Sequence, residues 1–126
     1  MKALQILQSA YRCTVEEQDD PALWFVQVLK TAQGDVDIVL KNNAVNYAVV
    51  SQDASGLSFG NWKQSQPSQL NQDLQQAIAQ GITIYAIAED IAVRGISDEK
   101  LLPGIQKISR LEMSNLFNNY DQVWTW

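Results

Sequence analysis

The sequence lacks several residues on which many enzymes depend. It has no histidine, one cysteine, and nine basic residues against fourteen acidic residues. Without histidine, the Ser-His-Asp and Cys-His catalytic arrangements and every histidine-ligated metal site are excluded. A single cysteine excludes an internal disulfide and a cysteine-rich zinc site, so no metal is expected. The net charge of -5 opposes binding to a phosphate backbone, so no direct nucleic-acid contact is expected.

Long hydrophobic runs are also missing. No stretch approaches the roughly 20 apolar residues that cross a bilayer, so no membrane contact is expected. Glutamines interrupt the apolar start of the chain, which is too short for a secretory signal. A lone thiol fits a reducing compartment, and we expect a cytoplasmic protein. Neither a G-x-G-x-x-G loop nor a Walker pattern occurs, so no cofactor is expected.

What the chain does have is the composition of one globular domain. Its 126 residues are 46% hydrophobic and 18% charged, which excludes general disorder and predicts a single domain over residues 1–126. Strands are predicted to alternate with helices, which indicates a flavodoxin-like α/β three-layer sandwich around a mostly parallel sheet of about five strands. The predicted strands are 3–8, 35–40, 82–88, 105–108 and 122–126, and the predicted helices are 21–33, 42–50, 68–80, 89–94 and 109–119.

Local signals support the helices. Apolar residues recur with helical spacing at Phe25, Val28, Leu29 and Ala32, which predicts that this face is buried. Between the second and third helices, turn-forming residues predict a long loop over 51–67, and loops of that length are usually functional or mobile. Three helices are expected to begin after a capping side chain. The predicted caps are Asp19 or Asp20, Asn42 or Asn43, and Ser68.

The only thiol lies near the predicted functional edge of the sheet. The carboxyl ends of parallel strands meet at one edge, where ligand and reaction sites gather, and Cys13 follows the first strand there. Its neighbour Arg12 favours the reactive thiolate, whereas the acidic residues at 16–20 oppose it. Cys13 is therefore the candidate for carrying sulfur as a persulfide or forming a mixed disulfide, with Arg12 as its helper. The alternative is an incidental loop cysteine.

Polar residues follow two other strands at the same edge. Paired acidic residues after the strand at 82–88 could perform acid–base chemistry, but stabilisation of a helix terminus also explains them. Three asparagines after the strand at 35–40 could line a pocket for a small anionic molecule, although capping explains at least one of them. The candidate binding residues are Asn42, Asn43, Asn46, Glu89, Asp90 and Arg94.

Aromatic residues mark candidate contact surfaces. Phe59 and Trp62 lie in the long loop, where they could anchor a partner or fold back as a lid. Trp124 and Trp126 share one face of the last strand, by the period of two. They fit either core packing or a subunit interface, where tryptophan is enriched.

One segment resembles a known family. Residues 85–96 read YAIAEDIAVRGI, and the chain ends QVWTW. This layout resembles the sulfur-relay family of DsrE, DsrF and DsrH and of TusB, TusC and TusD, with the closest likeness to the DsrH/TusB branch. There a strand leads into an EDL-x-ARG-L turn, then a short strand, a helix and a strand ending in tryptophan. The likeness covers the C-terminal third well and the rest only in strand order.

The resemblance implies a DsrE-like fold in a sulfur-transfer assembly. In that family, related subunits form a hexamer that passes sulfur as a cysteine persulfide, in tRNA 2-thiouridine synthesis or in sulfur oxidation. The sulfur-carrying cysteine of the DsrE/TusD branch aligns near Ile87, where this chain has no thiol. Either Cys13 substitutes for it, or the chain is a non-catalytic subunit that completes a partner's site. A small-molecule binder that uses the asparagines is a third reading.

Overall fold

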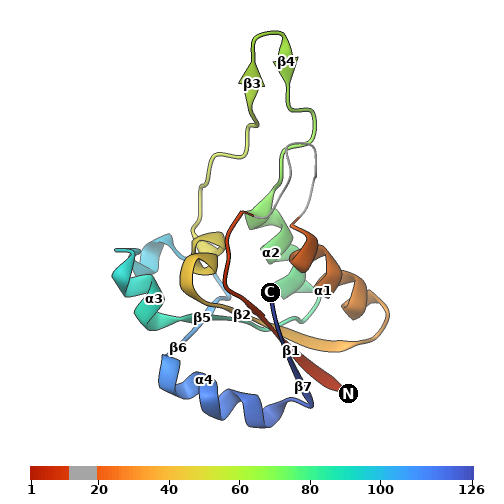
Figure 1. Cartoon of the computed structure of the whole chain (residues 1–126), viewed down its shortest axis with the longest axis vertical. Coiled ribbons are helices and arrows are strands. Elements are labelled where there is room, and N and C mark those ends of the chain that lie inside the picture. The colour runs from red at the N-terminus through yellow and green to blue at the C-terminus, as the bar shows by residue number, and fades with distance from the viewer. Residues whose placement is uncertain (12–19) are drawn as a thin grey trace.

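A parallel sheet of five strands forms the centre of the molecule (Figure 1). The structure is a computed structural model that describes residues 1–11 and 20–126. The strand order is β6-β5-β2-β1-β7, and every pairing in this sheet is parallel. The predicted α/β fold is confirmed, with each strand within about two residues of its expected bounds. The strands are β1 (Lys2–Leu7), β2 (Asp35–Leu40), β5 (Ile84–Ile87), β6 (Gln106–Ile108) and β7 (Gln122–Thr125).

The two central strands are buried on both faces. β1 and β2 pair over their full length, from Lys2 with Asp35 to Leu7 with Leu40. Five consecutive residues of each strand are buried. Continuous burial of this kind is typical of central parallel strands, because crossover helices cover both faces of the sheet.

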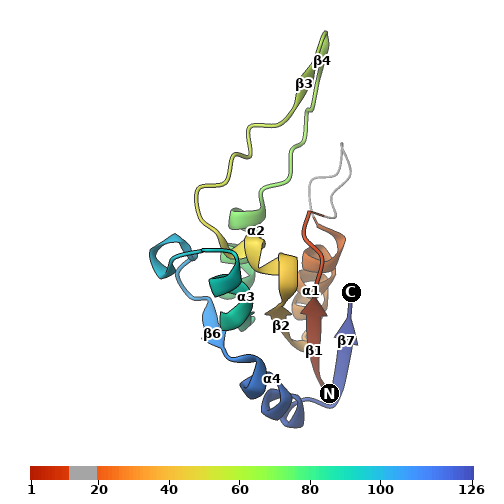
Figure 2. The same ribbon diagram turned by 60° about the vertical axis from the view of Figure 1, so that its left-hand side comes forward.

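Helices cover the two faces and create three layers. α1 (Pro21–Thr31) and α2 (Leu70–Ala79) lie on one side, and α4 (Arg110–Leu116) lies on the other, as the two views in Figures 1 and 2 show. The core beneath α1 and α2 is the larger one and also contains residues of the 3₁₀ helix η1 (Asn42–Ala48). The smaller core lies beneath α4 and its 3₁₀ extension η3 (Phe117–Asn119).

The buried face of α1 differs from the predicted one. Ala22, Leu23 and Val26 are buried, whereas Val28 is 42% exposed. The prediction failed because α1 is apolar on nearly all sides, so spacing alone could not select the face that meets the sheet. As a result, apolar side chains of α1 remain at the surface.

The helix caps were predicted correctly at one of three positions. Asp20 caps α1 by accepting hydrogen bonds from the backbone N–H groups of Ala22 and Leu23. At η1 the cap position is Lys41, and at α2 it is Gln69; neither side chain makes a capping bond. The predicted caps at Asn42 or Asn43 and at Ser68 are therefore wrong.

The long loop contains a small antiparallel hairpin that the sequence did not predict. β3 (Ser58–Phe59) pairs with β4 (Trp62–Lys63) through a turn that contains Gly60. Gly60 has φ +57°, a conformation that glycine adopts without strain. Figures 1 and 2 show this hairpin projecting away from the rest of the molecule. The remaining short helices are α3 (Ala88–Val93) and the 3₁₀ turn η2 (Asp98–Lys100).

A polar cluster joins the end of α4 to the sheet. The Tyr120 hydroxyl donates a 2.7 Å hydrogen bond to Asp37, and Lys2 lies 3.5 Å from the same carboxylate. The Lys2 ammonium also lies 4.9 Å from the centre of the Tyr120 ring. Burial and the hydrogen bond to Asp37 raise the pKa of Tyr120 above its ordinary value.

This shift predicts how stability depends on alkaline pH. Because the folded-state pKa is raised, the contribution of Tyr120 is fully present below the unfolded value of about 10 and is lost as the pH rises above it. Tyr120→Phe should lower the free energy of unfolding by about 1.5 kcal/mol at pH 7. Urea unfolding should show that the difference in the free energy of unfolding between the native protein and Tyr120→Phe becomes smaller above about pH 10. A difference that stays constant with pH would contradict the role given to Tyr120.

No helix among the described residues is both long enough and apolar enough to cross a membrane.

Candidate functional site

The carboxyl ends of the sheet strands define the candidate site. The chain adds β2, β5 and β6 on one side of β1 and then returns to place β7 on the other side. In open parallel sheets, ligand sites lie outside the strand ends where the order reverses in this way. Here the reversal lies at β1. The segment that follows β1 reaches Tyr11 and then residues 12–19, beyond which the description resumes at Asp20.

The two residues given a chemical role from the sequence fall in that segment. Cys13 and Arg12 both lie outside the described residues. Their described neighbours are held firmly at this edge. The Tyr11 hydroxyl donates to Gln52 at 2.8 Å, and its ring meets that of Tyr47 edge-on with centres 5.5 Å apart. Partial burial raises the pKa of Tyr11.

The carboxylate of Asp20, where the description resumes, is buried. Asp20 is fully buried and accepts hydrogen bonds from two backbone N–H groups of α1. It also accepts a 2.5 Å hydrogen bond from the hydroxyl of Tyr47, which is itself fully buried in η1. A buried carboxylate is stable only when it is bonded in this way. Asp20 and Tyr47 therefore join the start of α1 to η1.

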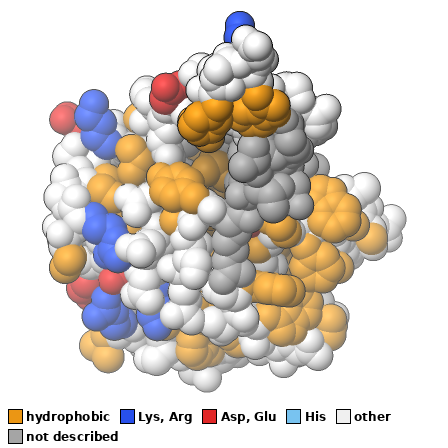
Figure 3. Space-filling view, turned by 45° about the horizontal axis from the view of Figure 1, so that its top comes forward, with side chains coloured by type: hydrophobic (Ala, Val, Ile, Leu, Met, Phe, Trp, Pro, Cys, Tyr) orange, Lys and Arg blue, Asp and Glu red, His pale blue; other side chains and the backbone are white. Residues whose placement is uncertain are grey.

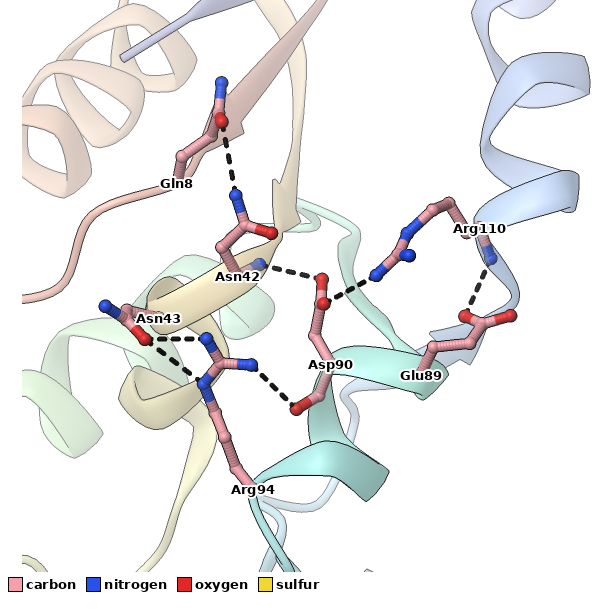
Figure 4. A network of polar contacts seen from close by, with 7 residues as sticks. All are labelled: Gln8, Asn42, Asn43, Glu89, Asp90, Arg94 and Arg110. Atoms are coloured by element: carbon pink, nitrogen blue, oxygen red, sulfur yellow. Dashed lines mark hydrogen bonds and ion pairs between the residues drawn. The ribbon is translucent and has the colours of Figure 1, made fainter.

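Asp90 is the centre of a polar network at the ends of β2, β5 and β6 (Figure 4). Its side chain is 7% exposed. One carboxylate oxygen accepts from the Asn42 backbone N–H at 2.8 Å, and the other lies 2.7 Å from Nη2 of Arg110. The neighbouring Glu89 accepts a 2.9 Å hydrogen bond from the backbone N–H of Arg110. The two acids thus join α3 to η1 and to the start of α4.

Arg94 ties the end of α3 to the same 3₁₀ helix. Its Nε and Nη2 donate to the Asn43 side-chain oxygen at 3.2 and 2.6 Å, and its Nη1 donates to the Asp90 carbonyl at 3.1 Å. The Asn46 amide donates to the Asn43 carbonyl at 2.9 Å. Gly95 follows with φ +65°, as expected for a helix end.

Asn42 has an unusual backbone conformation in this network. Its φ is +52°, which few residues other than glycine and asparagine adopt readily. The conformation directs its N–H to Asp90, while its side-chain amide donates to Gln8 at the end of β1 at 3.3 Å. Asn42 therefore links three strand ends rather than capping a helix.

The structure brings the six candidate binding residues together, but their polar groups mostly bind one another. Both oxygens of Asp90 and three guanidinium nitrogens of Arg94 are engaged within the network. Chemistry on a substrate would need these groups to exchange partners. This geometry favours a role in holding the strand ends in place.

An open groove of about 610 Å³ lies beside Tyr11. It runs between residues 52–57 and the first two turns of α2, and Gln64 and Ser68 also contribute to it. Most of its lining residues have amide or hydroxyl side chains, and Asp53 is the one charged residue among them. Tyr11, the last residue described before Arg12 and Cys13 in the sequence, lines this groove.

The four candidate interface aromatics fall into two groups. Phe59 and Trp62 stack on the hairpin with ring centres 5.9 Å apart and are 65% and 37% exposed. They do not fold back over a core. Trp124 and Trp126 both contact the ring of Phe25 on α1, and Trp126 is 47% exposed. The two C-terminal tryptophans are thus partly packed against α1 and partly exposed at the surface.

Sequence reasoning missed Arg110, Gln8 and the pair formed by Asp20 and Tyr47. Arg110 lies two residues after β6, so its place at this edge of the sheet could be predicted, but its partner Asp90 lies twenty residues earlier in another helix. Asp20 was predicted as a helix cap and as one of the acids near Cys13, and nothing in the sequence spacing indicates that Tyr47 donates to it. Among residues 1–11 and 20–126, no cluster of three acidic, cysteine or histidine side chains could hold a metal ion.

Comparison with known proteins identifies the fold. Neither a known family model nor a curated protein matches this chain. The chain is similar to the YchN protein of E. coli, with a TM-score of 0.69 and 17% identity over the whole of both chains. It is also similar to a conserved protein of unknown function from Bacteroides thetaiotaomicron, with a TM-score of 0.69 and 15% identity over 99% of this chain and 95% of that one. A protein of unknown function from Methanobacterium thermoautotrophicum has a TM-score of 0.58 and 12% identity over 98% and 99%.

These structures define the class of protein. The chain is an α/β protein with the fold of YchN, and the fold expected from the DsrE-like resemblance is confirmed. At such identities the likeness establishes the fold alone. It does not distinguish the DsrH/TusB branch from the others, and that placement stays a prediction.

Proposed function

We propose that this protein takes part in persulfide sulfur transfer as a subunit of a cytoplasmic assembly with related chains. The proposal is supported above all by topology, because Cys13 follows β1, where the strand order reverses. The YchN-like fold and the sequence resemblance to the sulfur-relay family point in the same direction. The position of the usual carrier cysteine, near Ile87, is a fully buried apolar site here. Cys13 is therefore the only thiol through which this chain could act.

The transfer needs a donor that is itself a persulfide. The thiolate of Cys13 attacks the terminal sulfur of the donor, a new S–S bond forms at Cys13, and the donor's S–S bond breaks. The donor leaves as a thiolate, so no external oxidant or reductant is consumed. Arg12 would favour the thiolate of Cys13 before the attack and the persulfide anion after it.

Intact-mass spectrometry after exposure to a persulfide donor tests this role. The protein should gain one sulfur atom, which a reductant removes, and Cys13→Ser should gain none. Arg12→Gln should slow the gain, and Arg12→Lys should largely restore it because the cation returns. An unmodified Cys13 after prolonged exposure would overturn the assignment of a carrier.

The alternative is a non-catalytic subunit that supports a partner's chemistry. The buried Ile87 and the exposed aromatic residues favour it. In that case the protein would take up no sulfur and would still form an oligomer. A related chain with a thiol at the position of Ile87 would then carry the sulfur.

The tryptophans of β7 provide a test of the assembly. Replacing Trp124 and Trp126 with serine should lower the mass on a sizing column, since Trp124 lies on the edge strand β7 and Trp126 lies just beyond its end. Because both rings also contact Phe25, the thermal melt of the variant must be followed in parallel. A folded variant with the mass of the native protein would remove β7 from the interface.

A further inference from the structure

Gln5 is a polar residue in the middle of the larger core. It lies on β1 between Ala3 and Leu7, which share its face of the sheet and belong to that core. Its neighbours on the adjacent strands are Ile38 of β2 and Trp124 of β7. The exposed fraction of Gln5 is 0%. An amide side chain is costly in such a position unless each of its polar atoms is hydrogen-bonded.

Only one end of the Gln5 amide has a partner in the described part of the chain. Its Nε2 donates to the carbonyl of Ala22, in the first turn of α1, at 3.3 Å. Its Oε1 is buried, and no group of residues 1–11 and 20–126 donates to it. Reversing the amide would not help, because it would place this oxygen against the Ala22 carbonyl, which is also an acceptor. The Gln5 Oε1 atom therefore needs a donor from outside the chain.

The first turn of α1 is the polar part of this core. The fully buried Asp20 accepts from the backbone N–H groups of Ala22 and Leu23 and from the hydroxyl of Tyr47. Gln5 and Asp20 thus bond the two sides of one residue, because Gln5 binds the carbonyl of Ala22 and Asp20 binds its N–H. A buried water molecule needs two to four polar partners, and here several such groups lie together.

The outer side of α1 does not help to hold this helix on the sheet. Trp24 and Val28 are 54% and 42% exposed, and Figure 3 shows hydrophobic side chains at the surface on the side of the molecule where α1 lies. The buried residues of α1 are Ala22, Leu23 and Val26. The polar contacts at the start of the helix therefore add to a short apolar face.

We propose that one water molecule is buried between β1 and the first turn of α1, where it donates a hydrogen bond to Oε1 of Gln5. An anion would be repelled by this acceptor oxygen, and a metal ion would need a group of ligand side chains that the described residues do not form. Folded proteins hold about one buried water per 27 residues, so a chain of 126 residues is expected to contain about four or five. This inference goes beyond the proposed function and does not depend on it.

Nuclear magnetic resonance of the native protein tests the site without any substitution. The Nε2 protons of Gln5 should show a cross-peak to a long-lived internal water. A crystal structure should show an ordered water about 2.5–3.0 Å from Oε1 of Gln5. A protein donor at that distance, or the lack of both the cross-peak and the water, would overturn the proposal.

A substitution at Gln5 gives an independent count of internal waters. Gln5→Met keeps the length of the side chain but removes the acceptor that binds the water. Oxygen-17 relaxation dispersion of the solvent should therefore show one long-lived water fewer than in the native protein. Leu7→Met, on the same face of the same strand, is the matched control and should retain the native number. The same number of waters in folded Gln5→Met as in the native protein would contradict the site.

Discussion

Replacing Asp20 with alanine should lower the free energy of unfolding by about 3 kcal/mol. The change removes the cap from the backbone N–H groups of Ala22 and Leu23. It also removes the acceptor of the 2.5 Å hydrogen bond from Tyr47, in a region where both side chains are fully buried. Urea unfolding at pH 7 would measure the loss, and the large value follows because a cap and a buried bond are lost together.

Two controls separate these contributions. Asp20→Asn retains an oxygen for capping and should lose less than Asp20→Ala. Asp35→Ala removes the same charge from an exposed position at the start of β2 and should change stability by less than about 0.5 kcal/mol. Equal losses for Asp20→Ala and Asp35→Ala would show that the buried contacts of Asp20 contribute nothing.

Asp20 shows which contacts of the site could be predicted from the sequence and which could not. Its capping role is local and was predicted, because an acidic residue before Pro21 at the start of an apolar helix is a short-range signal. Its bond to Tyr47 joins positions 27 residues apart. Such a pairing depends on how η1 packs against α1, which no local pattern specifies.

The fold was largely predictable for a related reason. The segments at 36–40 and 82–88, which contain β2 and β5, are mostly apolar and lie between turn-forming residues, and alternation with helices restricts the sheet to a parallel arrangement. The face of α1 was not predictable, because nearly every side of the helix is apolar. The hairpin at 58–63 was missed because each strand has only two residues, too few for an alternating pattern.

Sequence reasoning placed the candidate binding residues at one edge of the sheet, but it did not predict the contacts they make there. Parallel topology alone puts the ends of β2 and β5 at one edge, which brings Asn42 close to Asp90. The positive φ of Asn42 and the entry of Arg110 from α4 are three-dimensional outcomes. The sequence suggested acid–base or anion-binding roles for these residues, whereas the contacts direct most of their polar groups toward one another.

Replacing Asp90 with alanine should destabilise the protein by about 3 kcal/mol, the other large effect that the structure predicts. The carboxylate is 7% exposed and bonds both the Asn42 N–H and Arg110. Its removal leaves the strained backbone at Asn42 without the acceptor that holds it. Glu89→Ala, one residue earlier and exposed, is the matched control and should lose less than about 1 kcal/mol.

A double-mutant cycle with Arg110→Ala then isolates the ion pair. The Arg110 side chain is 54% exposed and returns to water when Asp90 is removed, so the coupling energy should be only about 1–2 kcal/mol. If the network positions the strand ends and takes no part in chemistry, folded Asp90→Asn should still accept sulfur at Cys13 at the native rate. If Asp90→Asn has the stability of the native protein but no longer takes up sulfur, Asp90 instead takes part in the reaction. That result would favour the acid–base role suggested by the paired carboxylates over the structural one indicated by their contacts.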